Sequence, residues 1–460
     1  MFSLNQNCTI KYVVLLLFTA IYCLFLFDNI QAQNFGWYNY TEWFVNYSGG
    51  FIRRGLPGQA LLILAQNGII TPFRAAFALG YFGILLVTAL YLWQLIRNMR
   101  RQTVLSLIAL LFLPVLPLFL LTIPGKKEIF GFLLVALNLK LVGDRIVQLK
   151  AQQLSELNDS DWQTVERKYS LQILFIFNAL AIPLILSHEA IFFLSLPVNI
   201  AISYVFLSMR NGRQVAAFKA LLLYIPTYLI FLLCFIGKGD SATTAAICES
   251  WKSLELMDCD ASSGSWLFIG HSWASHTFHF NKHILEHRSY LFYFIAGIIN
   301  LFFVICTSLK TLLSHPGILG VSATVKQKYL NGFLARYLWL PLIVSIPLYL
   351  LGWDWGRWLS AVLLNYAFCA LSPQLAQLEW ARVNRNQQSS DRALSSNRLS
   401  AFCSQWEKSV TSLTLLLQQY PRIYTLSLVY VVLFTSVPFY EMKLEHLYTG
   451  LIHHLIGIFA

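Results

Sequence analysis

The chain has 460 residues, of which 57% are hydrophobic, 15% aromatic and only 12% charged. A soluble protein of this length would carry about twice that charged fraction, so the composition excludes a soluble enzyme and predicts a protein that crosses a membrane many times. The formal charge of +12 does not indicate nucleic-acid binding, because the basic residues lie in short loops between apolar runs and form no continuous patch.

The first apolar run, residues 12–27, follows Lys11 and ends at Asp28. It could be a cleaved signal peptide, but its length favours an uncleaved first helix, and both readings place residues 28–72 outside the cytoplasm. Further apolar runs lie at 73–96, 104–122, 129–142, 171–186, 190–209, 220–236, 290–309, 337–351, 359–371 and 424–439. They predict an all-α, polytopic transmembrane helical bundle of about 11 spans, with roughly 10 to 13 allowed because two runs are shorter than a straight span requires.

The distribution of charge predicts the orientation. Alternating the runs from a cytoplasmic N-terminus places 22 of the 33 Lys and Arg residues on the cytoplasmic side, as the positive-inside rule requires. The chain is then one integral domain of a plasma (inner) membrane, with outer loops at 28–72 and 238–289 that carry short helices and long cytoplasmic segments at 143–170 and 372–422. No phosphate loop, dinucleotide fingerprint or internal repeat is present, so we expect neither a soluble nucleotide-binding domain nor a cofactor.

The most unusual stretch is residues 46–59, which reads NYSGGFIRRGLPGQ. Its glycines let the backbone approach a ligand closely, and the guanidinium groups of Arg53 and Arg54 match carboxylate or phosphate oxygens two bonds at a time. The alternative is that both arginines reach to lipid headgroups or cap a re-entrant helix. We interpret the stretch as part of an anion-binding site at one membrane face.

Two more polar elements interrupt the apolar pattern on the same predicted side. Lys126, Lys127 and Glu128 follow a Pro-Gly turn, and they could also be interfacial anchors. His188 and Glu189 interrupt nearly forty apolar residues; a charge within the bilayer is costly, so such residues usually line a cavity or are paired. The simpler alternative is that this pair ends two short helices in a tight outer turn.

The fourth element is GWDWGRW at residues 352–358, in which Asp354 and Arg357 lie among tryptophans. A mutual ion pair inside an aromatic belt would explain it without a ligand. Together, the four elements predict one cavity at the extracytoplasmic face.

The largest outer loop, 238–289, holds Cys248 and Cys259, which we expect to form a disulfide in an oxidising compartment. Four histidines recur in it at helical spacing: His276, His279, His283 and His287. Imidazoles can bind divalent metals, but interfacial histidines on a helix entering the membrane are the simpler interpretation, and we predict no metal site.

If the cavity holds a lipid-linked sugar diphosphate, transfer needs a carboxylate to accept the proton of the acceptor and cations to stabilise the departing diphosphate. The candidate bases are Glu42, Glu128, Glu189 and Asp354, with His188 beside them. The candidate diphosphate ligands are Arg53, Arg54, Lys126, Lys127 and Arg357.

The motifs GGFIRRG and DWGRW resemble those of bacterial polytopic proteins linked with surface-polysaccharide synthesis, and the general plan resembles the GT-C membrane glycosyltransferases and the O-antigen polymerases. The resemblance implies sugar transfer or polymerisation from a polyprenyl-diphosphate donor on the extracytoplasmic side. GT-C enzymes often place an acidic pair in their first outer loop, where this chain has Glu42 and the more distant Asp28, so the resemblance leaves the base unassigned.

Two alternatives remain open at this point. A transporter or flippase for an anionic lipid or glycan would need polar residues that continue through the bilayer, and partners for His188 and Glu189 toward the cytoplasmic face. A non-catalytic membrane protein would have the four elements far apart, lining no common site.

Overall fold

The computed structural model describes residues 2–31, 35–99, 102–112, 125–149, 159–254, 264–269, 340–351 and 355–372, and single positions beyond them. These residues form helices and connecting segments, with no strand among them. The helices that position the site are α1 (Phe2–Gln31), α2 (Trp37–Trp43), α3 (Gly55–Gln66), α4 (Pro72–Arg97), α5 (Val104–Phe112), η2 (Lys127–Phe130), α7 (Gly131–Leu149), α8 (Asp159–Gln172), α9 (Asn178–Ser187), α10 (Ala190–Leu207), α11 (Arg213–Leu222), α12 (Ile225–Ile236), α13 (Ser241–Lys252), η4 (Gly264–Phe268), α17 (Leu340–Leu351) and α18 (Trp355–Ala370).

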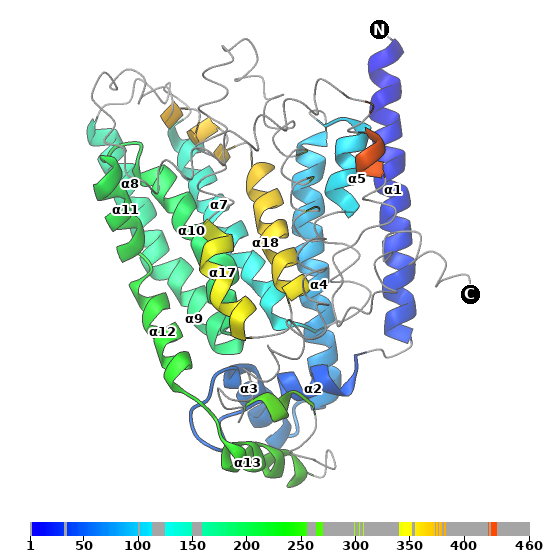
Figure 1. The fold of residues 1–460 in the computed structure, drawn as a ribbon, viewed down its shortest axis with the longest axis vertical. Coiled ribbons are helices and arrows are strands. Elements are labelled where there is room, and N and C mark those ends of the chain that lie inside the picture. The colour runs from blue at the N-terminus through cyan, green and yellow to red at the C-terminus, as the bar shows by residue number, and fades with distance from the viewer. Residues whose placement is uncertain are drawn as a thin grey trace.

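The long helices lie roughly side by side, and the short helices α2, α3 and α13 form a layer across one end of them (Figure 1). The start of α1 lies at the opposite end (Figure 1). Helix α10 packs against α7, α11, α17 and α18, and α9 packs against α12 and α3. We call the short-helix end, including η4, the capping layer.

The capping layer has its own apolar core, centred on aromatic rings. Phe44 packs on Trp251 with ring centroids 4.7 Å apart, and the indole of Trp251 donates a hydrogen bond to the Phe44 carbonyl at 2.8 Å. This contact joins α13 to the segment after α2, although 207 residues separate the two in sequence.

Among the described residues, three helices are long and apolar enough to cross a membrane: Pro72–Arg97, Asp159–Ser187 and Ala190–Leu207. A fourth crossing is formed if α11 and α12, which meet at a 53° bend, count as one broken span. The all-helical class is confirmed, because the described residues form helices and no strand. The count of about eleven spans is not confirmed, since several of the predicted runs lie largely outside the described residues.

The helix that contains α8 and α9 begins at Asp159, well before the predicted start of its apolar run at residue 171. Hydropathy marks only the part of a helix suited to lipid, whereas α8 is polar on one side and buries Trp162, Val165 and Tyr169 on the other. The turn Ile173–Phe177 between α8 and α9 is π-helical. Part of the predicted cytoplasmic segment 143–170 thus continues the bundle.

The two short runs that suggested kinked or re-entrant segments belong to helices inside the bundle. The run at 129–142 begins in η2 and continues as α7, and the run at 359–371 lies within α18 and the turn that follows it. Where their side chains are described, residues 358–371 are buried, so α18 packs against other helices along its length.

Candidate functional site

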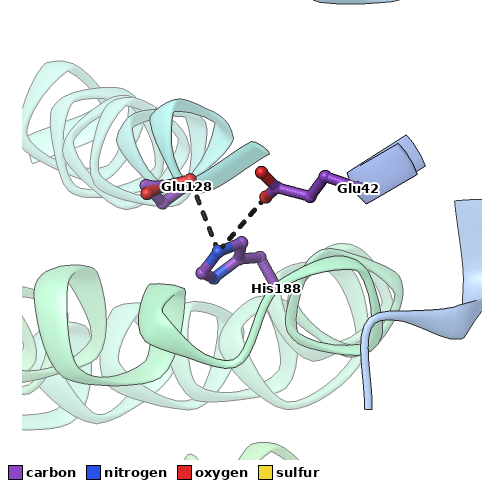
Figure 2. Close-up of side chains that lie close together, drawn as sticks. All are labelled: Glu42, Glu128 and His188. Atoms are coloured by element: carbon purple, nitrogen blue, oxygen red, sulfur yellow. Dashed lines mark ion pairs between the residues drawn. The ribbon is translucent and has the colours of Figure 1, made fainter. Parts of the chain in front are cut away.

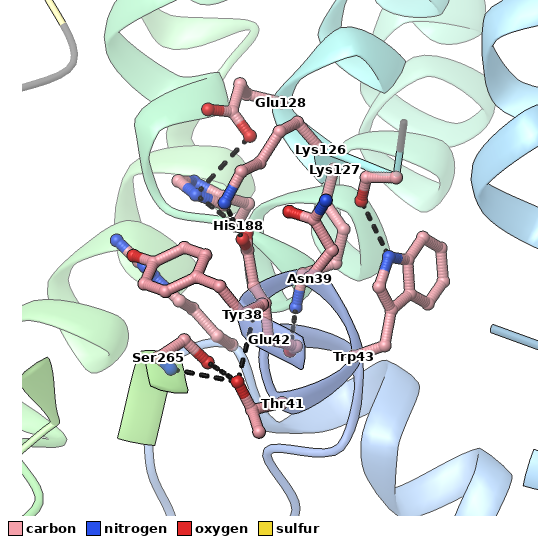
Figure 3. Close-up of polar contacts among 12 residues, drawn as sticks. Tyr38, Asn39, Thr41, Glu42, Trp43, Lys126, Lys127, Glu128, His188 and Ser265 are labelled. Carbon is pink, nitrogen blue, oxygen red and sulfur yellow. Dashed lines mark hydrogen bonds and ion pairs between the residues drawn. The ribbon is translucent and has the colours of Figure 1, made fainter. Parts of the chain in front are cut away.

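Three of the four polar elements meet where the capping layer covers the bundle. Glu42 comes from α2, Lys126, Lys127 and Glu128 come from η2 and the residue before it, and His188 comes from the junction of α9 and α10 (Figure 3). We call these charged groups the charge cluster. It also includes Glu189, which directly follows His188 in the chain, and the two arginines that pair with Glu189, Arg53 and Arg54.

The turn before η2 is held by close packing. Gly125 has φ +97°, a conformation that favours glycine, and a Cβ on it would lie 2.3 Å from the ring of Phe35. The Trp43 indole donates to the Gly125 carbonyl at 2.6 Å. This contact fixes Lys126 and Lys127 against α2.

Both lysines are directed at Glu42. The Lys126 ammonium donates to Glu42 Oε2 at 2.5 Å and lies 4.1 Å from the centre of the Tyr38 ring. The Lys127 ammonium donates to the main-chain carbonyl of Glu42 at 2.9 Å and lies over the Trp43 ring. All three charged side chains are buried, and in such an environment their mutual attraction is stronger than in water.

His188 lies between two carboxylates (Figure 2). Its Nε2 is 3.4 Å from Glu42 Oε1 and 3.5 Å from Glu128 Oε2. Its other nitrogen, Nδ1, accepts a hydrogen bond from the Ala190 main-chain N–H at 3.2 Å. Because burial lowers the pKa of His188 to about 4, the ring is neutral at neutral pH, and its single proton must be on Nε2, facing both carboxylates.

Glu42, Glu128 and His188 also have the composition of a metal site, since one donor atom from each lies within 4.8 Å of the others. A metal-binding histidine normally binds through one nitrogen and donates a proton from the other. Here Nδ1 accepts a hydrogen bond from a main-chain N–H, so the ring proton is on Nε2, and Lys126 already neutralises Glu42. A proton on Nε2 that faces both carboxylates leaves this nitrogen without a lone pair for a cation, although the 3.4 and 3.5 Å separations do not form hydrogen bonds.

The outer half of the cluster is an arginine–carboxylate pair with a second arginine beside it. Arg54 binds Glu189 with two hydrogen bonds, from Nε to Oε2 at 2.8 Å and from Nη2 to Oε1 at 2.7 Å. Such bidentate pairs fix both distance and orientation. Arg53 has a single contact, from Nη1 to Glu189 Oε1 at 3.4 Å.

The two halves differ in their access to solvent. The side chains of Arg53 and Arg54 are 34% and 27% exposed, and that of Glu189 is 13% exposed, whereas Lys126 and Glu42 are 2% exposed. A ligand would therefore meet the arginines before the buried half. In formal charge, four cations face three carboxylates, so the cluster favours an anion.

The local charges shift the proton affinities of these groups. Burial would raise the pKa of Glu42, but the attraction of Lys126 and further cations lowers it well below its ordinary value. Burial acts the same way on Glu189, and Arg54 followed by Arg53 lowers its pKa. Burial lowers the pKa of Lys127 to about 8, although Glu42 opposes the shift.

Arg54 is the only described residue other than glycine with a positive φ, at +68°. This backbone conformation is uncommon for a residue with a Cβ. Arg54 lies directly before α3. Its side chain is held by the two hydrogen bonds that it donates to Glu189. The strained residue is thus also the one that joins the capping layer to the α9–α10 junction.

Hydrogen bonds to η4 and α13 hold α2 and the segment after it in place. The hydroxyl of Thr41 accepts a hydrogen bond from the main-chain N–H of Ser265 at 2.9 Å, which ties α2 to η4 (Figure 3). The amide of Asn46 donates to the Ser250 hydroxyl on α13 at 2.9 Å. Glu42 therefore sits on a helix that is fixed on both sides.

The remaining predicted residues divide between described and undescribed parts of the chain. Asp354 lies outside the described residues, as do the four spaced histidines, and Arg357 is placed only as a position in α18 without its side chain. Cys248 is disulfide-bonded, whereas Cys259 lies outside the described residues, so their pairing stays a prediction.

Sequence reasoning missed the aromatic rings that contact the lysines and the proton arrangement of His188. Tyr38 and Glu42 are four residues apart on α2, which puts them on one helix face, and this spacing could have identified Tyr38. The hydrogen bond from Ala190 to His188 had no signal in the sequence, because it depends on the break between α9 and α10.

The described residues define an all-helical protein that has helices long and apolar enough to cross a membrane, and a charged site beneath a layer of short helices. No family model, curated protein or solved structure matches it.

Proposed function

We propose that this protein transfers or polymerises sugars from a polyprenyl-diphosphate donor at the extracytoplasmic face of the inner membrane, in the synthesis of a cell-surface polysaccharide. The observation that carries the proposal is the charge cluster, in which partly exposed arginines lie in front of buried lysines and carboxylates. The proposal extends the resemblance to GT-C glycosyltransferases and O-antigen polymerases.

Arg53 suits the first contact with the diphosphate. A guanidinium has five N–H donors, and among the described residues Arg53 places only one nitrogen near a carboxylate, at 3.4 Å. Arg54 is instead committed to Glu189 by two short hydrogen bonds. Arg53 is therefore the ligand-binding arginine in this scheme, and Arg54 and Glu189 are positioning residues.

In the reaction, the acceptor hydroxyl oxygen bonds to the anomeric carbon as the bond from that carbon to the donor phosphate breaks. The diphosphate leaves with the bonding electron pair, and the hydroxyl proton goes to a carboxylate. An efficient base has a pKa near the working pH, which disfavours Glu42 and Glu189 because cations lower both of their pKa values. Glu128 and Asp354 are the candidates that remain for this step, and the cations stabilise the leaving diphosphate.

A transport pathway finds less support. Among the described residues, the charged partners of the His188 and Glu189 side chains come from the capping-layer end: Glu42, Glu128, Arg53 and Arg54. This one-sided arrangement fits chemistry at one face of the membrane.

A second buried polar set lies inside the bundle, but its groups bind one another. Tyr169 donates to Asn138 Oδ1 at 2.8 Å, and Asn138 Nδ2 donates to the Asn199 carbonyl and to the Tyr224 hydroxyl at 3.1 Å. A network of this kind crosslinks α7, α8 and α10, and it does not extend to the charge cluster through any described hydrogen bond.

The test is complementation of surface-polysaccharide synthesis in a host that lacks this protein. Arg53→Ala and Arg54→Ala should abolish polymer formation while the protein still inserts in the membrane at wild-type levels. Arg210→Ala is the matched control, because Arg210 is also paired with carboxylates, Asp159 and Glu166, but lies away from the cluster. Wild-type polymer from both cluster variants would disprove the proposal.

A further inference from the structure

Helix α12 presents a continuous apolar stripe to its surroundings. Five of its side chains recur at helical spacing and are each 44–66% exposed: Ile225, Leu229, Leu232, Leu233 and Ile236. Residues four, seven, eight and eleven positions apart share one helix face. The opposite side of α12 is covered, because it packs against α9 and buries Cys234.

The stripe ends at the charge cluster. Directly after Ile236, the Gly237 carbonyl accepts a hydrogen bond from the main-chain N–H of Arg53 at 3.3 Å. A Cβ on Gly237 would lie 2.8 Å from the Phe51 ring, so the segment before Arg53 packs closely on the end of α12. Lys238 comes next and is exposed, and it forms no ion pair with any described carboxylate.

We infer that the α12 stripe binds the hydrocarbon tail of a phosphorylated lipid and delivers its diphosphate head to Lys238 and Arg53. The identity of that lipid as a polyprenyl diphosphate rests on the proposed function. A tail along Ile225–Ile236 buries apolar surface, while the head meets two cations at the end of the same helix. Arg53 then presents the diphosphate to the buried lysines.

Helix α1 lacks this combination. Helix α1 is also exposed to the surroundings at Leu16, Leu17 and Leu24, but its last residues before the capping layer, 28–31, include no Lys or Arg. Ordinary lipid would contact α1 and α12 equally, whereas a phosphorylated lipid guided by Lys238 and Arg53 would favour α12. This difference makes the inference testable.

The experiment uses the full-length protein in lipid nanodiscs, with a photoreactive phenylalanine analogue at the position of Leu233 or, as the control, of Leu24. Both positions are at least half exposed, so either substitution should leave the fold intact. Illumination with a radiolabelled polyprenyl diphosphate should label the Leu233 position much more strongly than the Leu24 position. Lys238→Ala should reduce that labelling about fivefold, the effect of one cation on an anionic lipid.

Competition identifies the ligand. Unlabelled polyprenyl diphosphate should abolish the labelling, while inorganic diphosphate and phosphatidylglycerol at the same concentration should not. Equal labelling at the two positions, or displacement by phosphatidylglycerol, would show ordinary lipid contact and overturn the inference. Arg53-dependent binding of the probe without labelling at Leu233 would overturn this route alone and leave the proposed function standing.

Discussion

Lys127 illustrates how this site holds charge in a buried position. Its side chain is fully buried, yet its ammonium group binds a main-chain carbonyl, lies over an indole ring and faces Glu42 at close range. Burial still dominates and lowers the pKa of Lys127 to about 8. The site therefore contains a lysine that loses its proton just above neutral pH.

This shift predicts a pH dependence of anion binding. Below pH 8 Lys127 is charged and attracts the diphosphate, and above it the charge is lost, so the affinity for a polyprenyl diphosphate should fall as the pH rises through the pKa of about 8. The loss of one charge should weaken binding on the order of tenfold. The measurement is the dissociation constant at several pH values on both sides of that pKa.

Lys127→Met provides the comparison for this titration. The variant should bind weakly at every pH and lose the step, because it has no titrating amine at this position. A step of the same size in Lys127→Met would assign the titration to another group.

The individual residues of the site could be found from sequence, but their pairings could not. The cost of a charge in apolar surroundings selected His188 and Glu189, and the glycines around two adjacent guanidinium groups selected Arg53 and Arg54. Arg54 and Glu189 are 135 residues apart, and four cations with three carboxylates offer many equivalent pairings. The choice among them depends on which helices pack together, and no local pattern encodes that.

At the scale of elements, α3 is placed by a backbone contact. A Cβ on Gly58 would lie 2.0 Å from the Val45 carbonyl oxygen, so the helix rests directly on the chain that follows α2. The main chain cannot yield as a flexible side chain would. This contact sets the distance between Arg54, at the start of α3, and Glu42, at the end of α2.

Gly58→Ala should therefore destabilise the capping layer by about 1–3 kcal/mol through overpacking. Thermal unfolding of the purified protein in detergent would measure the effect as a lower midpoint. Gly212→Ala is the control, because Gly212 has no atom within 4 Å of an added Cβ and its φ is −59°. Equal midpoints for Gly58→Ala and Gly212→Ala would contradict the close contact.

The prediction of elements succeeded where apolar runs coincide with whole helices. The run at 73–96 corresponds to α4, and the run at 190–209 covers α10. It failed at α8, where a polar helix extends the bundle. Short helices were expected in segments 28–72 and 238–289, and α2, α3 and α13 lie there, but their bounds could not be predicted because such helices carry no lipid-length signal. Element boundaries thus followed tertiary packing as much as hydropathy.

The whole molecule has two chemically different ends. The capping layer holds the charge cluster at one end, and at the other Glu166 accepts hydrogen bonds from Arg210 and Lys219. Lys238 follows α12 at the capping-layer end, and Arg213 begins α11 at the opposite end of the same broken span (Figure 1).

This arrangement makes the orientation that charge bias predicts testable by labelling at the two ends. A membrane-impermeant maleimide added to intact spheroplasts should label Lys238→Cys above the level of the parent chain and should not label Arg213→Cys. Membrane disruption should make both accessible. Labelling of Arg213→Cys in intact spheroplasts, with Lys238→Cys protected, would reverse the orientation and place the charge cluster on the cytoplasmic side.

The central claim, that the charge cluster binds a lipid-linked diphosphate, is tested most directly by equilibrium binding of radiolabelled polyprenyl diphosphate to the purified protein. We predict saturable binding that Arg53→Ala weakens at least about tenfold, since it removes the partly exposed guanidinium that the diphosphate meets first, and that Arg210→Ala leaves unchanged. Equal affinity in Arg53→Ala and the wild type, or an equal loss in Arg210→Ala, would contradict the claim.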